Sequence, residues 1–235
     1  MGEYDGVGEA CARVLGGIAD AARRSGRGPG EVVLLAVTKF HPLEAVEAAY
    51  RAGLRLFGES RVQEAEAKYP AFLASHPDAR LDMLGHLQSN KARKAAALFS
   101  RVQSVDSLDL LEELERRALA AGRELEVLLE LHTGEESKSG FASIEELWRA
   151  CDAGVGMRGV RLRGLMTMAP YTDDEGPVRA SFARLREALA EARRRFAIPG
   201  FDMLSMGMSN DYLIAVEEGS TLVRVGTAIF GRREP

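Results

Sequence analysis

Short apolar runs alternate with amphipathic stretches along most of the chain. The first run, Val32–Val37, holds no polar side chain, which is typical of a strand buried on both faces of a parallel sheet. Similar runs recur at intervals that leave room for a helix between neighbours. We predict eight strands, at Val32–Val37, Leu54–Phe57, Leu81–Leu84, Val102–Val105, Leu125–Leu131, Val160–Met166, Phe201–Ser205 and Leu222–Phe230.

Helical periodicity fills the intervals between the strands. In front of the first strand, Asp5–Arg24 places apolar side chains at helical spacing and ends at a Gly-rich break. Ser143 and Glu146 form a capping box, which marks the start of another helix. The predicted helices are Asp5–Arg24, Pro42–Arg51, Arg61–Lys68, Asn90–Leu98, one that is capped by Asp106 or Ser107 and runs to Ala121, one that begins at Ser143, Pro177–Phe196 and Asp211–Glu217.

Strands that alternate with helices predict parallel βαβ units. Eight such units favour a single (β/α)8 TIM barrel with an additional N-terminal helix. The rival is an open doubly wound sheet, which the lack of a Gly-x-Gly-x-x-Gly turn after the first strand weakens. With no internal repeat or linker, we expect one domain over 1–235, in which 1–30 form the leading helix and linker and 31–235 the barrel.

Composition narrows the class of protein. The 235 residues carry 31 Lys and Arg against 35 Asp and Glu, and the net charge of −4 argues against a general nucleic-acid binder. Two cysteines and four histidines show no metal-ligand or redox spacing, so we expect no metal and a reduced, cytoplasmic chain. No run of 18 apolar residues predicts a membrane span, and acidic residues near Met1 argue against a signal peptide.

In such a barrel, chemistry belongs at the C-terminal ends of the strands. Lys39 lies two residues after the first strand, where partial removal from water favours a neutral amine that can form a Schiff base with an aldehyde. A strand-end lysine that reaches solvent along its own stem has the same pattern. Position alone therefore leaves both readings of Lys39 open.

A second signal lies near the other end of the chain. Ser209 precedes a short helix, and Gly226 and Thr227 follow the start of the last strand, where barrels commonly hold a phosphate. Ordinary turn chemistry is the alternative. An aldehyde at Lys39 and a phosphate here together describe pyridoxal 5′-phosphate (PLP). Arg224, two residues before Gly226, is placed to face the pyridine nitrogen, and its permanent charge predicts a cofactor that is held more than used.

Six motifs along the chain resemble the pyridoxal phosphate homeostasis protein family, the YggS/PROSC-like proteins. They stand in the family's order, and the Gly-His-Leu-Gln-Ser-Asn-Lys and Ser-Met-Gly-Met-Ser runs are highly specific. The motifs are Leu35–Lys39, Phe57–Glu64, Gly85–Lys91, Gly134–Gly140, Leu204–Ser209 and Val223–Gly231.

The resemblance implies a barrel similar to the N-terminal domain of alanine racemase, with PLP held as an internal aldimine on Lys39. It implies further contacts from residues that match the family's motifs. Many members have Asn where this chain has Ser60 and His132. The resemblance implies Lys39, His86, Ser209, Arg224, Gly226 and Thr227 as cofactor-binding residues, and we also expect Ser60 and Met208 near the cofactor.

The family is regarded as non-enzymatic, and we expect a monomer that helps to balance vitamin B6 pools and passes PLP to PLP-dependent apo-enzymes. Alanine racemases carry a second, β-rich domain with a catalytic tyrosine, which we do not expect here. A small amino-acid racemase is the alternative, with Tyr171 as the second proton-transfer group. A phosphosugar-type barrel enzyme without a cofactor is a third hypothesis.

Overall fold

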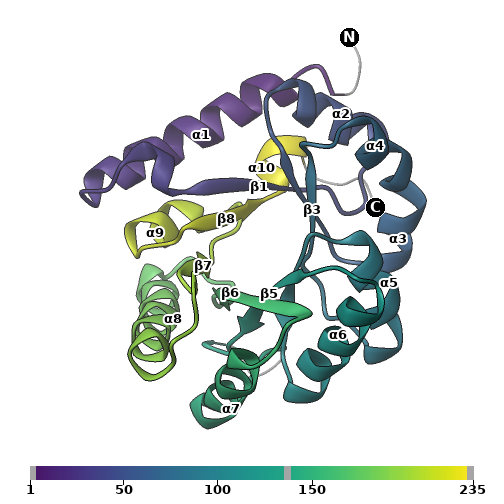
Figure 1. Cartoon of the computed structure of the whole chain (residues 1–235). Coiled ribbons are helices and arrows are strands. Elements are labelled where there is room, and N and C mark those ends of the chain that lie inside the picture. The colour runs from purple at the N-terminus through teal and green to yellow at the C-terminus, as the bar shows by residue number, and fades with distance from the viewer. Residues whose placement is uncertain (1–3, 135–138, 232–235) are drawn as a thin grey trace.

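Eight parallel strands close into one barrel (Figure 1). The computed structural model describes residues 4–134 and 139–231. Each strand pairs with its neighbour in sequence, and β8 closes onto β1, with Leu35 opposite Arg224. The predicted barrel is confirmed, and the open doubly wound sheet is excluded. The strands are β1 (Val33–Val37), β2 (Leu56–Glu59), β3 (Arg80–Met83), β4 (Arg101–Val105), β5 (Leu125–Glu130), β6 (Val160–Met166), β7 (Met203–Ser205) and β8 (Leu222–Val225).

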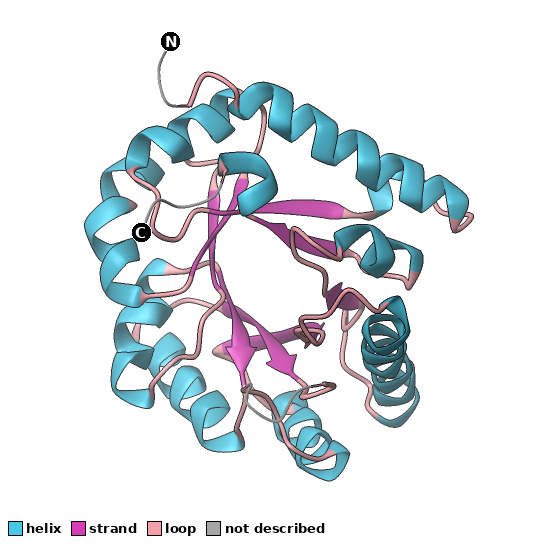
Figure 2. Cartoon of the chain, turned by 180° about the vertical axis from the view of Figure 1, so that it is seen from behind, coloured by secondary structure: helices cyan, strands magenta, loops and turns pink. Residues whose placement is uncertain are grey.

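Helices surround the barrel on its outside (Figure 2). The additional N-terminal helix is present as α1, which packs against α2, α9 and α10 and is tied to α9 by an ion pair between Arg24 and Glu217 at 2.8 Å. The α-helices are α1 (Val7–Arg24), α2 (Leu43–Arg51), α3 (Val62–Lys68), α4 (Pro70–Ser75), α5 (Ala92–Leu98), α6 (Leu108–Ala120), α7 (Ile144–Val155), α8 (Glu175–Arg195), α9 (Tyr212–Glu217) and α10 (Thr227–Phe230).

The prediction for the last strand was wrong beyond Val225. The backbone turns at Gly226, whose carbonyl accepts hydrogen bonds from Ile229 N and Phe230 N, and the chain continues as the short helix α10. The run after Gly226 is apolar enough to look like more strand, but only Ile229 of α10 is buried. The sequence pattern also missed α4, which follows α3 almost without a break.

The core has two parts. A large apolar layer lies between the barrel and its helices, and it includes Phe57, Phe99 and Phe182. Inside the barrel, a much smaller cluster gathers around Leu35 and Leu222. The strands also bury several polar or charged side chains, among them Asp82, Gln103, Glu130, Ser205 and Arg224.

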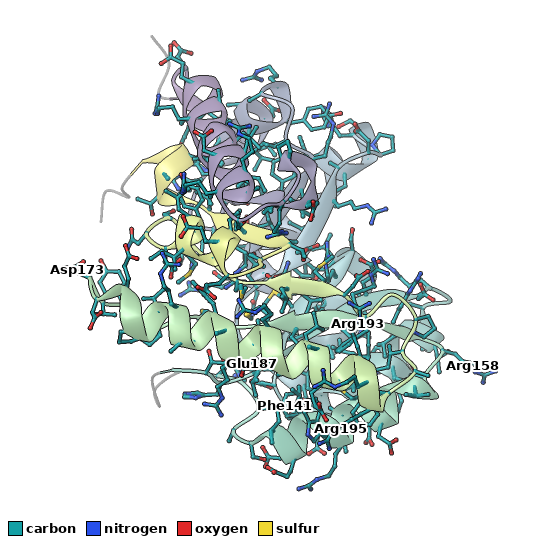
Figure 3. All side chains as sticks on the ribbon, turned by 90° about the vertical axis from the view of Figure 1, so that its left-hand side faces the viewer. Phe141, Arg158, Asp173, Glu187, Arg193 and Arg195 are labelled. Carbon is teal, nitrogen blue, oxygen red and sulfur yellow. The ribbon has the colours of Figure 1, made fainter. Side chains whose placement is uncertain are left out.

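The long helix α8 runs along one side of the barrel (Figure 3). Asp173 lies just before its first turn, and Arg193 and Arg195 lie at its other end. Asp174 caps the helix by accepting a hydrogen bond from Gly176 N. None of the helices in the described ranges is both long and apolar enough to cross a membrane.

Candidate functional site

A cavity of about 420 Å³ opens at the C-terminal ends of the strands. Cavities of this size are typical of sites for small molecules and cofactors. Its lining comes from segments far apart in the chain, which the closure of β8 onto β1 brings together. Every residue that the sequence indicated for a cofactor lines it: Lys39, Ser60, His86, Met208, Ser209, Arg224, Gly226 and Thr227.

Lys39 lies half-buried in a tight turn directly after β1. The strand side of this turn is anchored by Thr38, whose hydroxyl donates to Glu59 Oε1 at 2.7 Å and lies 2.6 Å from Tyr69 Oη. Phe40, on the other side of Lys39, has a left-handed backbone with φ of 64°. The turn therefore brings the lysine to the cavity wall.

Arg224 lies buried on β8 under the cavity. Its Nη1 donates to Ser205 Oγ at 2.6 Å and its Nη2 to the carbonyl of Thr167 at 2.8 Å. Burial lowers the pKa of Arg224 to about 10, against the opposing effect of the Glu130 and Asp211 carboxylates, so the guanidinium stays charged at neutral pH. Its Nε–H has no hydrogen-bond partner among the described residues and can donate to a ligand.

The loops after β7 and β8 bring backbone N–H groups together. Ser209 Oγ accepts hydrogen bonds from Gly226 N and Ala228 N, each at 3.3 Å. Gly207 has φ of 98°, and a β-carbon there would lie 2.5 Å from Ala215 Cβ, so only glycine fits this turn. Convergent N–H groups and a hydroxyl are what an anionic group needs.

The remaining predicted residues form the side of the cavity near β2 and β3. Ser60 is half-buried, and the backbone of Gly85 packs so closely on it that a β-carbon would lie 2.3 Å from the Ser60 carbonyl oxygen. His86 Nδ1 donates to Asp106 Oδ2 at 2.9 Å, with the histidine side chain 60% exposed. These contacts position His86 beside the cavity.

A buried polar network under the cavity was not predicted. Asp82 Oδ2 accepts from Arg101 Nε at 2.9 Å and from Gln103 Nε2 at 2.6 Å. Gln103 Oε1 in turn accepts from Ser205 Oγ at 2.6 Å, which connects the network to Arg224. The signal for it lay in isolated polar residues within otherwise apolar strands.

Glu130 is a further buried group that the sequence pattern did not single out. It lies at the end of β5, its Oε1 accepts from Ser139 Oγ at 3.0 Å, and its Oε2 has no hydrogen-bond partner within residues 4–134 and 139–231. Burial raises the pKa of Glu130 to about 7, although the Ser139 hydrogen bond and the charge of Arg224 oppose this. The carboxyl group therefore titrates near neutral pH.

Other sequence candidates have mixed outcomes. Tyr171 lines the cavity but is 80% exposed, and the cavity wall also includes Met168 and Pro170, which the sequence pattern did not indicate. His132 is not part of the wall. The polar segment Glu135–Lys138, which the flanking Gly134 and Gly140 make a candidate lid from the sequence alone, lies outside the described residues. Within 4–134 and 139–231, no group of His, Cys, Asp and Glu side chains is arranged to hold a metal ion.

Comparisons with known proteins agree with this architecture. The family model for the N-terminal domain of alanine racemase matches residues 19–234. A pyridoxal phosphate homeostasis protein of Pseudomonas aeruginosa is 43% identical over 229 residues, which cover 97% of this chain and 96% of that protein.

Solved structures give the same result. PipY of Synechococcus elongatus, a structure with PLP bound, is 40% identical with a TM-score of 0.84, over 96% of this chain and 100% of that chain. Alanine racemase from Streptomyces coelicolor is 26% identical with a TM-score of 0.70, over 93% of this chain and 58% of that chain. The similarity to PipY and to the Pseudomonas aeruginosa protein therefore extends over nearly the whole of both chains.

Proposed function

The chain belongs to the family of pyridoxal phosphate homeostasis proteins, and we propose that it binds PLP and helps to keep the supply of this cofactor in balance. The observation that carries the proposal is the convergence of Lys39, Arg224 and Ser209 on one cavity. The related PipY structure, which has PLP bound, supports the same assignment.

The residues of the cavity fit the three chemical features of PLP. Lys39 supplies an amine that can react with the aldehyde of PLP. We propose that the two are joined as an imine. The N–H groups of Gly226 and its neighbours, with the hydroxyl groups of Ser209 and Thr227, suit the phosphate. The Nε–H of Arg224 suits the pyridine nitrogen. When bound, PLP supplies an aldehyde carbon and an aromatic ring that withdraws electrons.

Arg224 favours a carrier over an enzyme. A charged guanidinium donates a hydrogen bond to the pyridine nitrogen and discourages a second proton there, because arginine remains protonated. An unprotonated pyridine withdraws electrons poorly. We therefore propose that the chain holds PLP without turning over substrate. We further propose that it is a cytoplasmic monomer and that it passes PLP to PLP-dependent apo-enzymes.

A small amino-acid racemase is the second candidate, because Tyr171 lines the same cavity and is accessible to solvent. Two-sided proton exchange at Cα needs a second acid–base group opposite Lys39. Incubation with PLP and a panel of amino acids in D2O distinguishes the two. The carrier predicts no deuterium at Cα, whereas incorporation that Tyr171→Phe abolishes would establish the racemase.

The direct test of binding is the absorption spectrum of the protein with PLP. We expect the band of a PLP imine in the wild-type protein and its loss in Lys39→Ala. Lys94→Ala is the matched control, because Lys94 pairs with Glu66 on the outside of the protein and should leave the band unchanged. An imine band that persists in Lys39→Ala would refute the assignment of the lysine.

A further inference from the structure

The turn that carries Lys39 has a conformation that needs outside support. Phe40 adopts φ of 64°, which is unfavourable for a residue with a β-carbon. The Phe40 side chain is 49% exposed, so burial of the ring does not impose this backbone. The Arg61 guanidinium lies 5.2 Å from the Phe40 ring centroid, which is a weak, exposed contact. The backbone of the turn also receives contacts from α3.

Glu64 on α3 makes one of those contacts. Its Oε1 accepts a hydrogen bond from the backbone N–H of Phe40 at 2.6 Å. The same oxygen lies 3.1 Å from Lys68 Nζ, one helical turn further along α3. A carboxylate that accepts from a backbone N–H forms a charge-assisted bond, which is stronger than a neutral one. Glu64 therefore fixes the peptide that joins Lys39 to Phe40.

Lys68 makes the complementary contacts to carbonyl groups. Its Nζ donates to the carbonyl of Thr38 at 2.9 Å and to that of His41 at 2.7 Å, which stand on either side of Lys39 and Phe40. The ammonium is nearly buried, with the side chain 8% exposed, and it lies 2.8 Å from Glu59 Oε1. One cation thus holds both ends of the turn.

We infer that Glu64 and Lys68 of α3 are positioning residues, which hold the Thr38–His41 turn so that the Lys39 amine meets the PLP aldehyde. This inference rests on the proposed function. Neither side chain lines the cavity, so neither acts by touching the cofactor. Glu64 and Lys68 should promote imine formation by orienting Lys39. They should not change the contacts of the protein with the phosphate and the ring of PLP.

The test compares two ligands in Glu64→Ala. PLP can form the imine, whereas 4′-deoxypyridoxine 5′-phosphate has no aldehyde and reports only the other contacts. Loss of a charge-assisted hydrogen bond predicts about a tenfold weaker imine formation with PLP. Binding of the analogue, measured by calorimetry, should be unchanged. Glu64→Gln keeps an oxygen acceptor for Phe40 N and should restore most of the imine.

Two further variants sharpen the result. Glu66→Ala removes a carboxylate from the same helix that pairs with Lys94, away from the turn, and should leave imine formation unchanged. Glycine adopts a left-handed backbone without strain. In a Phe40→Gly background, removal of Glu64 should therefore weaken the imine less than it does in the wild-type background.

The outcomes separate the two claims. A wild-type protein that forms no imine with PLP refutes the proposed function itself. If the wild-type protein forms the imine and Glu64→Ala forms it as readily as Glu66→Ala does, the positioning role of Glu64 is wrong. Equal weakening of PLP and of the analogue would mean a general structural role for Glu64, and this also overturns the inference.

Discussion

Glu130 offers a prediction that depends only on the folded structure. Glu130 is 1% exposed at the end of β5, and in the described part of the chain only one of its carboxyl oxygens has a hydrogen-bond partner. Besides Ser139, the groups that influence it are Arg224, Asp106 and His86. Replacement by glutamine keeps the size of the side chain and resembles the protonated carboxyl group. The variant Glu130→Gln therefore removes the charge without emptying the site.

The magnitude follows from the pKa. Burial raises the pKa of Glu130 from 4.5 to about 7, so between these values the folded chain binds more protons than the unfolded chain. The free energy of unfolding then falls as pH rises through this window. A difference of 7 − 4.5 pKa units corresponds to about 3 kcal/mol of unfolding free energy. The wild-type protein loses this whole amount only above pH 7. Glu130→Gln should therefore be more stable than wild type by about 3 kcal/mol at pH 8, and by under about 1 kcal/mol at pH 5.

Urea denaturation followed by circular dichroism, at pH 5 and pH 8, measures the difference. Glu187→Gln, an exposed position on α8, is the matched control and should not change the stability difference between the two pH values. If Glu130→Gln gains no more stability at pH 8 than at pH 5, the carboxyl group is not held protonated by burial, and the reasoning is refuted.

Three other substitutions test the cavity and the network beneath it. In Gly226→Ala, the new β-carbon would lie 3.1 Å from the Val37 carbonyl oxygen, so PLP affinity measured by fluorescence titration should fall. Ser209→Ala removes a hydroxyl from the proposed phosphate cradle and should weaken PLP several-fold in the same titration, and unchanged affinity would remove Ser209 from the site. Arg101→Met leaves Asp82 buried without its cation, so urea denaturation should show a loss of about 3–5 kcal/mol.

The barrel could be predicted because parallel strands buried on both faces have a simple sequence pattern. Runs such as Val32–Val37 are apolar throughout, and the helices between them carry caps and helical periodicity. The same rule failed after Gly226, where an apolar run continues but the backbone turns into α10. Apolar character predicts burial, and it does not distinguish a strand from a short helix.

The cavity wall could be predicted for a similar reason. The C-terminal ends of the strands of a barrel meet at one face, so Lys39 and Arg224 could be placed together from their positions in the chain alone. The hydrogen-bond partners of Glu64 and Asp82 could not be predicted from the sequence. Glu64 lies on a helix surface, and its contact to Phe40 exists only because α3 packs beside the end of β1. Asp82 is a lone charge in a strand until the pairing of β3 with β4 places Arg101 opposite it.

We propose a covalent bond between Lys39 and PLP, and borohydride reduction is the measurement that detects it. The reagent reduces an imine to a stable amine, and mass analysis of the digested protein then locates the pyridoxyl group. We expect one adduct, on the peptide that contains Lys39. An adduct on a different lysine, or none after incubation with PLP, would contradict it.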